Sequence, residues 1–104
     1  MVLLIQTTVN KKQIADRLAG DIVRNHLAAC VNIVPDVTSV YRWKSEIVTE
    51  TECLLFIKTT EDKLESLKKY MSDHHPYEVP EFAVFPLEHL NQDYLHWLTD
   101  AVND

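Results

Sequence analysis

Residues 28–59, AACVNIVPDVTSVYRWKSEIVTETECLLFIKT, decide which fold this chain of 104 residues adopts. The first part, residues 28–43, is dominated by β-branched and aromatic residues, which is typical of a strand. Pro35 predicts a bulge or a sheet edge within it, because its nitrogen cannot donate a hydrogen bond to a neighbouring strand. The polar residues 44–46 turn the chain and residues 47–59 form the return strand, so the stretch predicts a long β-hairpin.

Before the hairpin, the sequence predicts one strand and one helix. Residues 1–9 are mostly apolar and β-branched, as expected of a strand. Apolar residues then recur every three or four positions, which predicts an amphipathic helix over 11–26. Asn10 is a suitable cap for that helix, because its side-chain oxygen can accept a hydrogen bond from the first helical turn.

After the hairpin, the sequence predicts a helix over 61–73, a strand over 81–86 and a final helix over 92–102. Pro76 ends the first of these helices, since a proline disfavours helical geometry in the residue before it. The strand is stopped by the proline at its last position, and Asn91 is placed to cap the final helix.

The predicted order is therefore β-α-β-β-α-β with an additional C-terminal helix. This is the ferredoxin-like arrangement of the α+β class, in which helices pack on one face of an antiparallel sheet. The length suits one domain, so we expect residues 1–104 to form a single domain.

The net charge of −6 argues against a nucleic-acid partner, because phosphates require a basic surface. No apolar run is long enough to span a membrane. The two cysteines, Cys30 and Cys53, are too few for a disulfide framework and form no CxxC pair. We expect a cytoplasmic protein with reduced thiols that binds neither nucleic acid nor membrane.

Three predicted strand segments are apolar on both faces: residues 2–5, 53–57 and 82–85. A sheet with helices on one face only should instead alternate apolar and polar residues. The second face therefore needs a cover, which further copies of the same chain would supply. The alternative is that the C-terminal helix covers this face alone.

Residues 74–81, HHPYEVPE, hold the densest group of potential ligands, with two imidazoles, a phenol and two carboxylates. Copper or zinc could bind His75 and Glu81 there, with a thiolate such as Cys30 from elsewhere. The stretch lacks the HxxxH or CxxC spacing of a closed metal site. The other interpretation is a rigid connector in which His75 and Glu81 make structural hydrogen bonds, while Cys30 acts as a small hydrophobic residue.

Five further side chains could line a cleft or an interface: Trp43, Lys58, Tyr77, Tyr94 and Trp97. Large aromatic residues serve either as walls of a small-molecule pocket or as packing anchors between subunits. Lys58 could bind an anion or simply extend from its strand into solvent. A single glycine rules out glycine-rich phosphate loops, and nothing pairs a nucleophile with a base, so we expect no catalytic activity.

Five motifs, in this order, resemble those of the CutA divalent-cation tolerance proteins and together cover essentially the whole chain. They are residues 27–33 (LAACVNI), 39–43 (SVYRW), 58–60 (KTT), 74–81 (HHPYEVPE) and 94–97 (YLHW). The resemblance implies a ferredoxin-like subunit in a tight trimer built through its long strands, similar in architecture to the nitrogen-regulatory PII signalling proteins. It also implies a link to copper and other divalent metals.

The resemblance also implies roles for individual positions. Cys30, His75 and Glu81 match the family's cysteine, histidine and glutamate and are the implied metal ligands. Four residues match its pocket-lining or interface positions: Trp43, Lys58, Tyr94 and Trp97. Ser45 stands where the family often has glycine, which leaves the tightness of the hairpin turn open.

The sequence thus favours a homotrimer that binds or responds to copper or another divalent cation, with no organic cofactor. The alternative is a PII-like regulatory or scaffolding trimer, whose clefts between subunits bind a small molecule or a partner protein. The aromatic residues separate the two, because a ligand-binding cleft requires them to line open space.

Overall fold

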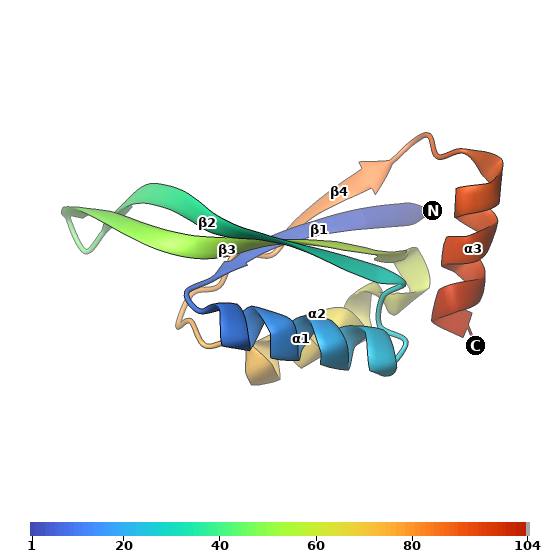
Figure 1. Cartoon of the computed structure of the whole chain (residues 1–104), viewed down its shortest axis with the longest axis horizontal. Helices are drawn as coiled ribbons and strands as arrows, with labels where there is room; N and C mark the ends of the chain where they lie inside the picture. The colour runs from blue at the N-terminus through green and yellow to red at the C-terminus, as the bar shows by residue number, and fades with distance from the viewer. Residues whose placement is uncertain (104) are drawn as a thin grey trace.

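A four-stranded antiparallel sheet in the order β2-β3-β1-β4 carries the fold (Figure 1). The computed structural model describes residues 1–103. Its elements are β1 (Val2–Val9), α1 (Lys12–Arg24), β2 (Cys30–Trp43), β3 (Glu46–Thr60), a 3-10 turn (Glu61–Lys63), α2 (Leu64–His74), β4 (Ala83–Leu87) and α3 (Gln92–Asn103). The predicted α+β class and ferredoxin-like order are confirmed. No helix among these residues is long and apolar enough to cross a membrane.

The main core lies between the sheet and the helices α1 and α2, which run along the same face of the sheet (Figure 1). Strand alternation sends every second side chain of β1 and β3 to this face, including Ile5 and Ile57, both fully buried. The 3.6-residue period of α1 does the same for Leu18 and Ile22. Burial of these apolar side chains is the main stabilising term of the fold.

α3 stands across one end of the sheet, opposite the hairpin, instead of covering the second face (Figure 1). Its Leu98 and Val102 form a small separate core with Val2 and Ala29. The rest of the second face stays open: Leu4, Leu54 and Phe56 are half-buried, Val34 is 40% exposed and Phe85 is 45% exposed. We call these five residues the open apolar face. The alternative in which α3 covers the second face alone is therefore wrong.

The β2–β3 hairpin extends well past β1, because β1 pairs with β3 only as far as the pair Val9 and Cys53. The chain is 45 Å long for this reason, although its other extents are 26 and 22 Å. The predicted irregularity at Pro35 is present as a register shift between Val34 and Val37, with Asp36 at a φ of 60°. The bulge marks where the hairpin leaves the sheet.

The hairpin turn is tight, although Ser45 replaces glycine. Trp43 pairs directly with Glu46, so only Lys44 and Ser45 form the loop. Their φ angles of 49° and 70° are those of the two-residue turn whose twist matches the flanking strands. Both residues therefore adopt a left-handed conformation that a Cβ atom disfavours.

Two local predictions differ from the structure. The residue that caps α1 is Lys11, not Asn10, and no side chain accepts a capping hydrogen bond there. The predicted strand 81–86 starts later and continues through Pro86 to Leu87. β4 tolerates the proline because it is an edge strand that pairs only with β1. The predicted cap at Asn91 is confirmed, since its Oδ1 accepts the Tyr94 N–H over 2.9 Å.

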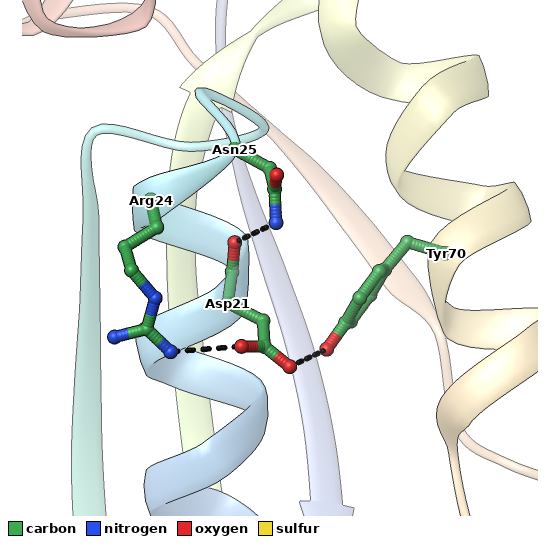
Figure 2. A network of polar contacts seen from close by, with 4 residues as sticks. All are labelled: Asp21, Arg24, Asn25 and Tyr70. Carbon is green, nitrogen blue, oxygen red and sulfur yellow. Dashed lines mark hydrogen bonds and ion pairs between the residues drawn. The ribbon is translucent and has the colours of Figure 1, made fainter.

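A polar network on the surface fastens α2 to α1 (Figure 2). The Tyr70 hydroxyl donates to Asp21 Oδ2 over 3.0 Å, and Arg24 donates to Asp21 Oδ1 over 2.8 Å. Asn25 donates to the Asp21 carbonyl and closes the end of α1. Burial, reinforced by the Asp21 carboxylate, raises the pKa of Tyr70 to about 12, so this phenol remains a donor at neutral pH.

Ser45→Gly should stabilise the protein. Glycine removes the crowding of Cβ at a φ of 70°, and this gain exceeds the extra entropy of glycine in the unfolded chain. We expect the free energy of unfolding in urea to rise by roughly 0.5–1 kcal/mol. Thr49→Gly, at an exposed position of β3, is the matched control and should lower it by a similar amount. A Ser45→Gly variant less stable than the parent would contradict the turn geometry.

Candidate functional site

A groove of about 640 Å³ lies where the hairpin leaves the sheet, between the hairpin and the connector that joins α2 to β4. Strand alternation puts Ser39, Tyr41 and Trp43 of β2 on the same hairpin face as Val48, Glu50 and Glu52 of β3, and all six line the groove. The connector supplies the opposite wall through Pro76, Tyr77, Glu78, Val79 and Glu81, while Thr8 and Asn10 complete the lining.

The charged side chains that line the groove are all acidic: Glu50, Glu52, Glu78 and Glu81. None of the ion pairs formed among the described residues involves any of these four carboxylates. Glu52 is the most enclosed of them, with only 6% of its surface exposed. The groove is therefore a site of negative potential with aromatic side chains on both walls.

His75 locks the start of the connector onto β1. Its Nε2 lies 3.0 Å from the Thr8 carbonyl oxygen and 3.1 Å from Thr7 Oγ1. Its Nδ1 accepts the Tyr77 N–H over 3.2 Å. Because a carbonyl can only accept, the proton lies on Nε2 and the ring is neutral. Burial lowers the pKa of His75, which favours the same neutral form.

Tyr77 fastens the connector to the base of the hairpin. Its hydroxyl donates to Glu52 Oε2, and its ring meets the His75 ring edge-on, with centroids 4.9 Å apart. Burial and the Glu52 carboxylate both raise the pKa of Tyr77, so it remains protonated. The predicted rigid connector thus has a physical basis in two hydrogen-bonded side chains as well as in its prolines.

Glu81 lies at the far end of the connector, where Gln6 Nε2 donates to its Oε2 over 3.0 Å. His75 and Glu81 therefore both belong to the connector, as predicted. Both imidazole nitrogens of His75 are already occupied by protein groups, so a metal ion could bind this residue only by displacing one of them.

Cys30 lies elsewhere, at the start of β2, where it pairs with Lys58. Lys58 pairs in turn with Leu4 of β1. Leu4 is four positions, or about 13 Å, along β1 from Thr8, whose carbonyl binds His75. Among residues 1–103 no three His, Cys, Asp or Glu side chains converge to hold a metal ion. Within one chain, the predicted ligand set of Cys30, His75 and Glu81 is not assembled.

The predicted aromatic set is also divided between two places. Trp43 lies on the groove wall, whereas Tyr94 and Trp97 lie on α3, their ring centroids 5.4 Å apart. Lys58 contacts Tyr94 there, with its Nζ 3.4 Å from the hydroxyl and 5.6 Å from the ring centroid. Cys30, Lys58 and Tyr94 therefore form a second group at the α3 end of the sheet.

Three groove residues were not predicted from the sequence: Tyr41, Glu50 and Glu52. The signal for them was the alternation in residues 48–52, which places both glutamates on the hairpin face that carries Trp43. Alternation alone could not show that the connector would close over this face.

The chain matches known proteins along almost its whole length. Residues 3–101 match the family described as CutA1 divalent ion tolerance protein. The Divalent-cation tolerance protein CutA of Thermus thermophilus is 42% identical over 97 residues, which cover 93% of this chain and 94% of the relative. The rice Protein CutA 1, chloroplastic, is 41% identical over 98% of this chain, but the chain spans only 58% of that relative.

Solved structures agree with the sequence comparison. The Thermus thermophilus divalent cation tolerance protein superposes with a TM-score of 0.93 at 42% identity, covering 97% of this chain and 98% of that one. The periplasmic divalent cation tolerance protein CutA of Archaeoglobus fulgidus gives 0.94 at 29% identity, covering 98% and 99%.

The His75 contacts predict a specific loss of stability in acid. Its folded-state pKa lies below the ordinary value of 6.5, so the unfolded chain binds more protons as the pH falls through 6.5 toward the folded-state value. The free energy of unfolding should therefore be constant above this window and decrease within it. Urea denaturation from about pH 8 to about pH 5 measures the slope.

His75→Gln should be less stable than the parent at neutral pH, yet should lose this part of the slope. The exposed His89 provides the control, because His89→Gln should keep the slope of the parent. Equal slopes in the parent and in His75→Gln would show that the imidazole is not held neutral by its contacts.

Proposed function

The chain belongs to the CutA1 divalent ion tolerance protein family, and on that premise we propose that it is a trimeric, copper-responsive subunit acting in the cytoplasm. The names of its relatives support a general role in divalent-cation tolerance. The observation that carries the proposal is the match over residues 3–101, together with the open apolar face. Binding, not catalysis, is the proposed activity.

The trimer is proposed from uncovered apolar surface. The open apolar face, with Phe85 at 45% and Val34 at 40% exposed, is continuous across several strands. The 14 residues of β2 also form a sheet edge with unpaired backbone groups. Packing against further copies of the chain would bury the apolar face and pair the backbone groups of the β2 edge. Closed symmetry limits such an assembly to a few chains.

Copper is proposed over magnesium because Cys30 and His75 are soft and borderline ligands. Their separation within one chain does not fit a single closed site. In this scheme the thiolate of Cys30 is the main copper ligand, and neighbouring chains of the oligomer supply the further ligands. The ion is cargo or signal in this scheme and supplies no chemistry.

Metal titration tests the copper proposal. We expect saturable binding of copper to the metal-stripped oligomer by calorimetry, weaker binding of zinc and none of magnesium. Cys30→Ser should weaken copper binding by about tenfold or more, as expected when a soft ligand is lost. Cys53→Ala is the matched control, because Cys53 is buried in the core at 5% exposure. Copper binding that survives loss of both Cys30 and His75 would overturn the proposed ligands.

A mass measurement tests the trimer. Light scattering after size-exclusion chromatography should give about 36 kDa, three times the 12.1 kDa of one chain. Phe85→Lys should lower the mass toward that of one chain, since a charge would be buried in the contact. Val23→Lys is the control, an equally drastic change at an exposed site of α1 outside the open apolar face. A monomeric parent protein would contradict the proposal.

A second candidate function is favoured by the groove. In this scheme the trimer is a PII-like regulatory or scaffolding protein that binds a small molecule in its clefts. Trp43 supports it, because this residue is 39% exposed and lines a groove of about 640 Å³, a size typical of small-molecule sites. Tyr94 and Trp97 do not contribute to this groove, since both lie on α3 at the opposite end of the sheet.

A further inference from the structure

We propose that the groove binds a small organic cation, one that carries a guanidinium or substituted ammonium group on a short apolar body. The inference rests on the second candidate function and names the ligand class for it. It is carried by the shape of the groove, its aromatic walls and the sign of its charge.

The groove has the dimensions and walls of a small-molecule site. Its volume of about 640 Å³ is typical of sites that hold a metabolite-sized ligand. Tyr41 and Trp43 stand on the hairpin wall with 37% and 39% of their surfaces exposed, and Tyr77 stands on the connector. Exposed aromatic faces in a hollow offer both apolar contact and attraction for a cation.

The Trp43 ring already attracts a cation in this structure. Nζ of the neighbouring Lys44 lies over the ring, 5.7 Å from its centroid. Lys44 is exposed at the hairpin turn, so a ligand in the groove can replace or join this contact.

Two of the four groove carboxylates, Glu52 and Glu81, are held in place by neutral donors, which orient them without neutralising them. Glu52 accepts from the Tyr77 hydroxyl and Glu81 accepts from the Gln6 amide. A hydrogen bond to Glu50, joined by slight burial, raises the pKa of Tyr41, so that phenol also remains a donor. Negative charge without a cationic partner, fixed in a preformed hollow, is complementary to a cationic ligand.

The spacing of the carboxylates favours an extended cation over a metal ion. A bound metal requires several ligand atoms within about 2–2.6 Å of one point. Among the described residues no three acidic, His or Cys side chains converge in this way. A guanidinium group, with five N–H donors in a plane, can instead bridge separated carboxylates while its apolar body packs on an aromatic ring.

Titration with agmatine tests the proposal on the assembled protein. Agmatine carries a guanidinium and an ammonium on a butyl chain, and N-butylurea is a neutral control of similar shape. We expect saturable binding of agmatine by calorimetry and by a change in tryptophan fluorescence that is absent in Trp43→Leu. N-butylurea should bind at least about tenfold more weakly, and added salt should weaken agmatine binding, because the attraction is electrostatic.

Two groove variants and one matched control locate the site. Trp43→Leu and Glu50→Gln should each weaken agmatine binding by about fivefold, the loss expected for a partly exposed cation–π contact or ion pair. Glu88→Gln changes an exposed carboxylate outside the groove and should bind as the parent does. Equal losses in Glu88→Gln would show that net charge alone attracts the ligand and would overturn the site.

The outcomes separate this inference from the functions on which it builds. The inference would be overturned if agmatine showed no saturable binding up to about 10 mM. This holds whether another copy of the chain fills the groove or the groove does not suit a cation. Binding of N-butylurea that is lost in Trp43→Leu, without binding of agmatine, would overturn the ligand class and keep the ligand-binding function. Copper binding should be the same in Trp43→Leu and the parent, so the metal titration succeeds or fails on its own.

Discussion

The sheet is apolar on both faces, yet the chain has helices to cover only one of them, and this constraint governs the rest of the structure. α1 and α2 cover the first face, whereas α3 reaches only the end of the second. Phe56 and Phe85 consequently remain in contact with solvent in a single chain. The hydrophobic effect then favours association, and the long hairpin offers both surface and sheet edge for it.

The same hairpin creates the groove, because it continues past the strand that would otherwise neighbour it. Once β3 leaves β1 beyond Cys53, the edge of β3 next to Glu50 and Glu52 has no strand beside it. The connector fills part of that space, held by His75 on one side and by Tyr77 on the other. The fold therefore places a rigid acidic groove and an uncovered apolar surface on one molecule, and each suits a different kind of partner.

Local patterns in the sequence determined the order of the elements and much of their detail. Alternation and helical periodicity fixed which residues face the core, because side-chain direction follows from backbone geometry alone. Pro35 marked the bulge, Pro76 marked the end of α2 and Asn91 marked the cap of α3, since each acts through its own backbone or side-chain chemistry. The resemblance to the CutA proteins rested on the same residues and is confirmed.

Only the tertiary structure decided which of these residues meet. Cys30 and His75 belong to different ends of the sheet, because antiparallel pairing through β3 places the start of β2 level with Leu4 and not with Thr8. Antiparallel pairing also places Trp43 at the hairpin turn, whereas Trp97 lies on α3 at the opposite end of the sheet. Sequence fixes the direction of each side chain from its neighbours, whereas distances between elements depend on register and packing, which form only when the whole sheet does.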